Sequence, residues 1–268
     1  MNDLSKIDAA ILCGGLGKRL RGEIGESQKV MAKIGRDPFL DILLQDLAQQ
    51  GFKRFILMTG YKAESLEEYY RTNKFGVTIK FSREPKPLGT GGALKNARGL
   101  IRSDPFVCLN GDSLCSLDYQ EFFDFYSAKK ADAALVLSKV EDNQDFGTIT
   151  LDRAQRIISF QEKQRPSENL SFPNALVGNP DKTMTGPPIR TFGGDSFDRF
   201  FYVNAGVYCF SKKVFDWMPA AAKFMFETDF FPRIVQKEIY GFVTQQKFLD
   251  IGTPERFKKA QTTLRKDP

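Results

Sequence analysis

A glycine-rich, basic stretch near the N-terminus is the first segment with residues suited to phosphate chemistry. Residues 14–19 read GGLGKR and directly follow an apolar run. Glycine lets a backbone approach phosphate closely and point amide groups at it. The spacing matches neither a Rossmann fingerprint nor a P-loop, because Leu20 and Arg19 stand where those motifs need glycine. For the glycines alone, a tight turn is the alternative interpretation.

A lysine and two aspartates add further chemistry. Lys29 lies in the same loop as Arg19, and two cations there could neutralise charge at an α-phosphate and on departing pyrophosphate. Asp112, in the NGD sequence of residues 110–112, and Asp250 each end an apolar run, where a carboxylate could hold Mg²⁺. Considered singly, Lys29 could be a solvated lysine, Asp112 a turn residue and Asp250 an aid to helix capping.

The composition excludes several classes of catalyst. The 268 residues include no histidine, which rules out Ser-His and Cys-His catalysis and any zinc site that needs imidazole. No CxxC pair is present, and Cys13, Cys108 and Cys209 lie in apolar runs, where buried thiols are expected. The net charge of +6 is spread along the chain, which suits a polyphosphate substrate better than nucleic acid. Without a signal peptide or membrane span, a cytoplasmic protein with no membrane partner is expected.

The elements that must position these residues form an α/β pattern. We expect strands at 7–13, 55–58, 77–81, 105–109 and 134–137, and helices from Pro38 to Gly51 and at 63–73, 93–98 and 119–130. Strands that alternate with helices through short loops indicate a three-layer, mostly parallel, Rossmann-like sheet covered on both faces. Ligands bind such sheets beyond the carboxyl ends of the strands, where the segments described above fall.

The alternation of predicted strands and helices stops after residue 139. We expect paired strands at 147–151 and 156–160, further strands at 202–209 and 248–252, and a last helix capped by Thr253 with Pro254 at its first position. Residues 164–200 are rich in Pro, Gly, Ser and Asn, and we interpret them as a long loop or flap.

Several motifs in one order carry a family resemblance. They are GGLGKRL (14–20), Lys29-Val30-Met31, PLGTGGAL (87–94), NGD (110–112), FGTI (146–149), Glu162-Lys163, NAGVY (204–208) and DIGTPE (250–255). Over nearly its whole length the chain resembles the sugar-phosphate nucleotidyltransferase family. It is most similar to the guanylyltransferases of D-glycero-D-manno-heptose 1-phosphate, and next to those of mannose 1-phosphate. The resemblance implies a single GT-A-like domain over 1–268, with a nucleotide-binding half at about 7–140 and a sugar-phosphate-binding half at about 141–268.

The resemblance also implies a role for each matching residue. Arg19 and Lys29 would be catalytic, Arg19 on the leaving pyrophosphate and Lys29 on the α-phosphate. Asp112 and Asp250 would bind Mg²⁺, or Mn²⁺ in its place. The remaining nucleotide-binding positions would be Leu12, Gly14, Gly15, Gly17, Lys18, Glu84, Pro87, Gly89, Thr90 and Gly111. The sugar phosphate would be held by Gly147, Glu162, Lys163 and Asn204.

Two positions need separate comment. Gln28 stands where the family usually has proline, and proline would stiffen the loop before Lys29. An ionised Glu84 could accept the N1–H and N2–H₂ donors of guanine, which favours GTP, although a solvated loop glutamate is the alternative.

We therefore expect transfer of a nucleotidyl group from a nucleoside triphosphate, GTP favoured, to a sugar 1-phosphate, heptose 1-phosphate favoured, with release of pyrophosphate. A sugar 1-phosphate is already a competent nucleophile at neutral pH, so positioning and charge neutralisation suffice. The alternatives are a mannose 1-phosphate guanylyltransferase, a uridylyl-, cytidylyl- or thymidylyltransferase, and a non-catalytic regulatory subunit that binds nucleotide-sugars. The sequence leaves the sugar and a homo-oligomeric state open.

Overall fold

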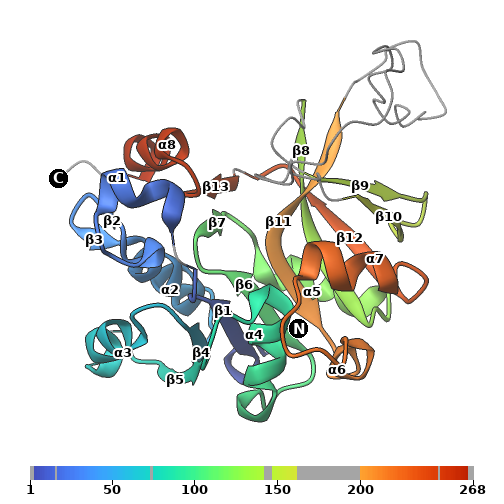
Figure 1. Cartoon of the computed structure of the whole chain (residues 1–268). Coiled ribbons are helices and arrows are strands. Elements are labelled where there is room, and N and C mark those ends of the chain that lie inside the picture. The colour runs from blue at the N-terminus through green and yellow to red at the C-terminus, as the bar shows by residue number, and fades with distance from the viewer. Residues whose placement is uncertain are drawn as a thin grey trace, which may run out of the picture.

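A nine-stranded sheet forms the centre of the part of the chain described by the computed structural model (Figure 1). The described residues are 3–15, 17–72, 75–141, 147–161, 200–246 and 248–264. Four neighbouring strands run parallel in the order β5-β4-β1-β6. Their bounds are β1 Asp8–Leu12, β4 Arg54–Thr59, β5 Thr78–Arg83 and β6 Phe106–Asn110. The parallel arrangement expected for these strands is confirmed.

The second half of the sheet is mixed. Its central strand is β11, Phe201–Phe210, which pairs antiparallel with β6, β8 and β9. β9 and β10 form the antiparallel pair that the sequence predicts, and β8 pairs in parallel with β12, a strand that the sequence analysis did not foresee. The bounds are β8 Ala133–Val140, β9 Thr148–Leu151, β10 Ile157–Gln161 and β12 Ile239–Thr244.

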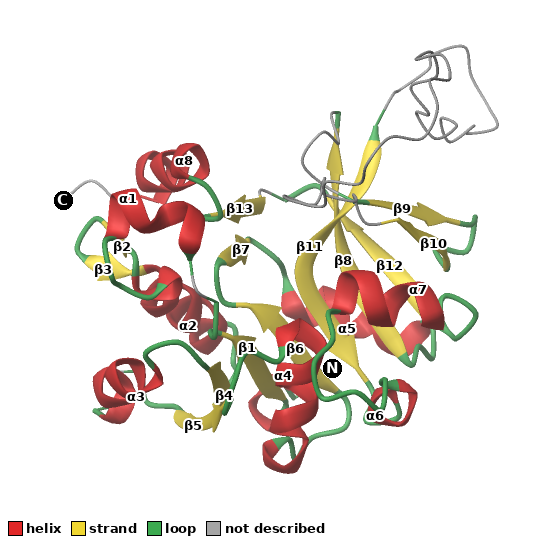
Figure 2. Ribbon diagram, viewed as in Figure 1, coloured by secondary structure: helices red, strands yellow, loops and turns green. Residues whose placement is uncertain are grey.

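Helices cover both faces of the sheet and give the three layers that were expected (Figure 2). β1 shows how one strand contributes to two cores: Ala9 and Ile11 belong to the apolar cluster on one face, and Ala10 to the cluster on the other. On the first face lie α2 Phe39–Gln49, α3 Ala63–Arg71, α5 Tyr119–Ala128 and α8 Pro254–Leu264. On the second lie α4 Gly89–Ala97, α6 Val214–Trp217 and α7 Phe231–Ile234.

Short elements complete the described structure. β7, Ser113–Cys115, pairs antiparallel with β13, Phe248–Asp250, and so brings a late segment of the chain beside the end of β6. The strands β2 Lys33–Ile34 and β3 Asp37–Pro38 form a small ribbon, and α1 covers Arg21–Ile24. No helix in the described ranges is long and apolar enough to cross a membrane.

The start of α4 corrects one expectation. The sequence predicts a loop up to Gly92 and a helix from Ala93, but the helix begins at Gly89, so the glycines form its first turn. The cause is close packing on a distant segment. A Cβ at Gly91 would collide with the ring of Phe224, and the N–H groups of Gly91 and Gly92 both donate to the Phe224 carbonyl at 3.2 Å. This tertiary contact overrides the low helix propensity of glycine.

Candidate active site

A cavity of about 540 Å³ opens at the carboxyl ends of the parallel strands. Its walls come from the loops that follow β1, β4, β5 and β6, as the rule for open α/β sheets predicts. Its volume suits a ligand the size of a nucleotide. The residues assigned to a ligand from the sequence that line it are Leu12, Gly14, Gly15, Lys29, Glu84, Pro87, Gly89, Thr90 and Asp112.

Backbone hydrogen bonds hold the strand ends together around this cavity. The N–H of Gly111 donates to the carbonyl of Leu12 at 3.0 Å, which ties the end of β6 to the end of β1. A Cβ at Gly111 would lie 2.6 Å from that same carbonyl oxygen, so only glycine fits there. Gly111 therefore allows the close approach of two strand ends that places Asp112.

The two glycines after β1 differ in their surroundings. A Cβ at Gly14 would collide with Oε1 of Glu84, so Gly14 makes room for that carboxylate. Gly15 is exposed, and nothing lies within 4 Å of the position of its missing Cβ. Gly15 is therefore the glycine at which a phosphate could approach the backbone without obstruction.

Lys29 is held firmly by its neighbours. It starts a 3₁₀ turn, Lys29–Met31, and a Cβ at Gly17, whose φ is 57°, would lie 3.1 Å from the Cβ of Lys29. Val30 packs on Gly111, where an added Cβ would lie 3.2 Å from Cγ1 of Val30. The Lys29 side chain is 14% exposed and forms an ion pair with Asp112. Gly17 and Gly111 thus support the segment that carries Lys29 and do not line the cavity.

Asp250 lies near the ion pair that Lys29 forms with Asp112. The pairing of β13 with β7 brings the two aspartates from distant parts of the sequence to one place. A Cβ at Gly252 would lie 2.7 Å from Oδ1 of Asp250 and 3.5 Å from Nζ of Lys29, the atom that bonds Asp112. Lys29 and Asp112, which line the cavity, therefore have the Asp250 carboxylate as a near neighbour outside the cavity lining.

Asp250 has further partners at the start of α8. Its Oδ1 accepts the N–H of Gly252 at 2.8 Å, and its Oδ2 lies 3.1 Å from the guanidinium of Arg256. The helix cap itself belongs to Thr253, whose Oγ1 accepts the N–H of Arg256 at 3.3 Å, and Pro254 is the first helical residue, as predicted. Asp250 is therefore held in place by the helix start without being its cap.

The donor atoms of this pair suit Mg²⁺. In phosphate-handling sites Mg²⁺ takes one or two carboxylates and completes its shell with waters and substrate phosphates. Among the described residues no group of three or more His, Cys, Asp or Glu side chains is placed to hold a metal ion. Asp112 and Asp250 are consequently suited to an ion that arrives with phosphate, and not to a cage made by protein alone.

Glu84 is a half-buried carboxylate in the cavity wall. Its Oε2 accepts the N–H of Leu88 at 2.7 Å, and its Oε1 lies against Gly14 and Gly60. Burial raises the pKa of Glu84 above its ordinary value, while the bond from Leu88 opposes that rise. A desolvated carboxylate beside a cavity is typical of a functional group. The N–H of Leu88 already donates to Oε2. A base that donates to both oxygens of Glu84 would therefore share Oε2 with Leu88.

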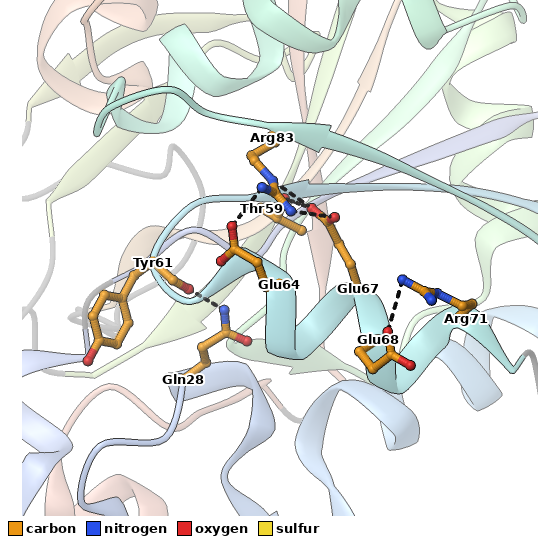
Figure 3. Close-up of polar contacts among 8 residues, drawn as sticks. All are labelled: Gln28, Thr59, Tyr61, Glu64, Glu67, Glu68, Arg71 and Arg83. Carbon is orange, nitrogen blue, oxygen red and sulfur yellow. Dashed lines mark hydrogen bonds and ion pairs between the residues drawn. The ribbon is translucent and has the colours of Figure 1, made fainter.

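Arg83, the residue before Glu84, bonds two glutamates of α3 (Figure 3). Its guanidinium donates to Glu64 at 2.6 Å and to Glu67 at 2.8 Å, and the hydroxyl of Thr59 donates to Glu67 at 3.1 Å. The bonds from Arg83 hold the pKa of Glu67 below its ordinary value. This network joins the ends of β4 and β5 to α3. It therefore holds the end of β5, which Glu84 directly follows.

Several predicted site residues do not line the cavity. Lys18 and Arg19 are exposed on a 3₁₀ turn, Lys18–Leu20, beside it. Asn204 has both ends of its side chain engaged, because Nδ2 donates to the hydroxyl of Tyr208 at 2.8 Å and Oδ1 accepts the N–H of Gly206 at 3.0 Å. Gly147 is half-buried, ahead of β9. Glu162, Lys163, Leu16 and all but the last residue of the predicted loop 164–200 lie outside the described residues.

Other lining residues were missed by sequence reasoning. Tyr61 and Asn110 lie next to strand ends, so their positions alone could have indicated them. Lys86 lies within the predicted loop but was not singled out. Met225, 39% exposed, comes from a segment without periodicity, and no sequence signal marked it.

The cysteines take no part in this chemistry. All four are buried and free, as expected for the three in apolar runs. Burial raises the pKa of the Cys115 thiol to about 11 and raises the pKa values of the other three as well. These thiols therefore stay protonated at neutral pH and are poor nucleophiles.

A three-layer α/β fold with an open glycine, a lysine and two carboxylates at its strand ends defines a nucleotide-handling enzyme. The chain belongs to the nucleotidyl transferase family, whose profile matches residues 8–267. It is 36% identical over 259 residues to the D-glycero-alpha-D-manno-heptose 1-phosphate guanylyltransferase of Aneurinibacillus thermoaerophilus, covering 96% of this chain and 98% of that one.

Two further relatives agree with this membership. The mannose-1-phosphate guanylyltransferase of Mycobacterium tuberculosis is 31% identical over 97% of this chain, which spans 65% of that protein. The crystal structure of HddC from Yersinia pseudotuberculosis in complex with GMP-PN superposes with a TM-score of 0.75 at 32% identity, covering 97% of this chain and 100% of that one. The expected fold and the expected enzyme class, nucleotidyl transfer to a sugar 1-phosphate, are confirmed.

Proposed function

We propose that the enzyme transfers the guanylyl group of GTP to a D-glycero-D-manno-heptose 1-phosphate, giving GDP-heptose and pyrophosphate. The observation that supports the chemistry best is the meeting of Lys29, Asp112 and Asp250 at the edge of the strand-end cavity. These residues would supply a fixed cation and two oxygen ligands for a metal ion where a triphosphate would enter.

The choice of GTP is supported by two observations. Guanylyltransferases are the relatives at 36% and 31% identity, and the HddC crystal holds GMP-PN. Glu84 lines the cavity, and its Oε1 would accept from a donor on a base, while the N–H of Leu88 occupies its Oε2. Guanine presents two adjacent donors, whereas uracil and thymine present one between two acceptors.

The reaction follows from the charges of the participants. An anionic phosphate oxygen of the sugar 1-phosphate attacks the α-phosphorus of GTP, and the bond from that phosphorus to the bridging oxygen breaks, with its electron pair leaving on pyrophosphate. Lys29 would contact the α-phosphate, and Arg19 the departing pyrophosphate, once its exposed side chain turns toward the ligand. No side chain needs to remove a proton, which is consistent with a chain that lacks histidine.

Asp112 and Asp250 would hold Mg²⁺, or Mn²⁺ in its place. Such an ion, when bound, neutralises phosphate charge and orients the α-phosphate. The protein's own contribution is to fix the two carboxylates through the β7–β13 pair and the start of α8. Glu162, Lys163, Gly147 and Asn204 remain the proposed contacts of the sugar phosphate.

Mannose 1-phosphate is the second candidate acceptor. It is supported by the 31% identity to the mannose-1-phosphate guanylyltransferase of Mycobacterium tuberculosis. The heptose is favoured because its relative is matched at 36% identity over 98% of its length, compared with 65% for the mannose enzyme.

Steady-state pyrophosphate release tests the proposal. GTP, UTP, CTP and dTTP are each paired with heptose 1-phosphate, and GTP is then paired with heptose, mannose and glucose 1-phosphates. The proposal predicts that kcat/KM is at least tenfold higher for GTP with heptose 1-phosphate than for any other pair. A higher kcat/KM with a pyrimidine nucleotide would refute the guanylyl assignment, and a higher value with mannose 1-phosphate would refute the heptose.

A further inference from the structure

The side chain of Gln28 crosses from one cavity loop to another (Figure 3). Gln28 is 4% exposed, and its Nε2 donates a hydrogen bond to the backbone carbonyl of Tyr61. A carbonyl only accepts, so the amide must present its nitrogen there. The other end, Oε1, is consequently buried and has no hydrogen-bond partner among the described residues. Buried polar atoms are nearly always hydrogen-bonded, so this exception calls for an explanation.

Gln28 is directly joined to the segment that carries Lys29. It is the residue before the 3₁₀ turn Lys29–Met31, and its own carbonyl accepts the N–H of Met31 at 3.0 Å. Tyr61, whose carbonyl accepts the hydrogen bond from the Gln28 side-chain amide, lines the same cavity as Lys29. Any rotation of the backbone at Gln28 therefore moves the start of the turn from which the lysine projects.

Two outer contacts reinforce the same pair of loops. The hydroxyl of Tyr61 donates to the Glu26 carboxylate at 2.9 Å, and Nζ of Lys62 donates to the Glu26 carbonyl at 2.8 Å. Both involve exposed groups, whereas the Gln28 bond is partly buried and its donor residue is buried. Of these contacts the Gln28 amide is the one that water competes with least.

The backbone at Gln28 has a conformation that a rigid residue could also supply. Its φ is −65° and its ψ is 144°, and no hydrogen bond uses its N–H within the described part of the chain. Proline fixes φ near −65° and has no N–H to donate. The side-chain bond of Gln28 thus maintains a geometry that proline would impose through its ring.

We propose that Gln28 is a positioning residue for nucleotidyl transfer, whose amide fastens the Lys29 segment to the Tyr61 loop and so aims the ammonium at the α-phosphate. The inference rests on the proposed role of Lys29. Gln28 is not among the residues that line the cavity, and its effect would pass through the orientation of the lysine. Loss of the bond would let the lysine move, and small displacements of a catalytic group lower the rate of the chemical step steeply.

A double-mutant cycle tests this directly. Gln28→Leu removes the amide at nearly constant volume and is expected to lower kcat about tenfold, with KM for GTP within about twofold of wild type. In a Lys29→Met background the same change should lower kcat no further, because the residue through which it acts is gone. Gln28→Pro should recover most of the kcat lost in Gln28→Leu, because the ring restores the constraint.

Gln50→Leu is the matched control. Gln50 also ties two segments through its amide, donating to Asp46 at 3.1 Å and accepting the N–H of Tyr119 at 3.1 Å, but it does not line the cavity. It should alter thermal stability and leave kcat unchanged.

The outcomes separate the inference from the role on which it rests. If Lys29→Met is slow, any of three results would overturn the inference. They are wild-type kcat in Gln28→Leu, an equal loss of kcat from Gln28→Leu in the wild-type and Lys29→Met backgrounds, and a Gln28→Pro variant as slow as Gln28→Leu. Wild-type kcat in Lys29→Met itself would show that the proposed role of Lys29, and with it the inference, is wrong.

Discussion

The ammonium of Lys29 forms an ion pair with the carboxylate of Asp112, and their side chains are 14% and 33% exposed. The lysine comes from the loop after β1 and the aspartate from the loop after β6, so the pair exists only when both strand ends are in register. In the absence of ligand each charge has its partner. In the proposed reaction Asp112 would also bind the metal ion, and Lys29 would also contact the α-phosphate.

Removing the cations should slow the chemical step. Lys29→Met and Arg19→Ala are each expected to lower kcat by roughly 100-fold, since one lost charge-stabilising donor typically costs about 3 kcal/mol in the transition state. KM should rise much less, because these contacts strengthen as charge develops on pyrophosphate. Lys33→Met, at an exposed lysine of β2, is the control and should keep wild-type kinetics. Wild-type kcat in both site variants would remove this loop from catalysis.

Metal dependence should be strict. Excess chelator should abolish turnover, and Mg²⁺ or Mn²⁺ should restore it. Asp112→Asn should lower kcat by about 100-fold or more while the far-UV circular dichroism stays native. Asp216→Asn changes an aspartate in an exposed ion pair with Arg98 and should leave activity intact. Undiminished activity in chelator would exclude the proposed role of Asp112 and Asp250.

Glu84 should make stability depend on pH in a specific direction. Its pKa is raised above the ordinary value of 4.5 by burial, so the fold favours the protonated form, and ionisation at neutral pH costs stability. Glu84→Gln cannot ionise and should therefore have a higher Tm than wild type at pH 7. The difference should shrink as the pH falls toward 4.5, where wild-type Glu84 also becomes protonated.

The same variant probes base choice. Glu84→Gln should lose part of its preference for GTP over UTP, since an amide presents only one acceptor. Glu68→Gln, at an exposed glutamate paired with Arg71, should change neither property and serves as the control. A Tm difference that grows on acidification would contradict the destabilising ionisation of Glu84. An unchanged base preference would contradict its role in base recognition.

The first turn of α4 should tolerate no added side chain. In Gly91→Ala the new Cβ meets the ring of the buried Phe224, and such overpacking costs about 1–3 kcal/mol, a fall in Tm of roughly 2–12 °C for a chain of this size. Gly99→Ala, just after the same helix, meets nothing within 4 Å and should not lower Tm. Differential scanning calorimetry distinguishes the two, and equal Tm values would show that the packing on Phe224 is not needed.

Several elements could be predicted because their signals are local. The apolar run of β1, the amphipathic face of α2 and the cap at Thr253 each specify an element without reference to the rest of the chain. The clustering of Gly15, Lys29 and Asp112 also followed, since strand ends of a parallel sheet meet at one edge. These positions needed only the order of strands and helices.

The remainder depended on contacts between distant segments. The PLGTGGAL sequence does not predict that Phe224 will lie against Gly91, yet this contact determines where α4 starts. Met225 reaches the cavity by the same packing. The pairing of β13 with β7 likewise determines that Asp250 meets Asp112, and strand pairing of short segments is not encoded locally.

One competition experiment tests the central claim most directly. The enzyme is given equal concentrations of GTP, UTP, CTP and dTTP with equal concentrations of D-glycero-α-D-manno-heptose 1-phosphate and mannose 1-phosphate in Mg²⁺, and the nucleotide-sugars formed early are identified by mass spectrometry. Product ratios report ratios of kcat/KM. The account predicts GDP-heptose as the dominant product, with pyrophosphate in equal amount. A dominant UDP-, CDP- or dTDP-sugar, or no nucleotide-sugar at all, would contradict it.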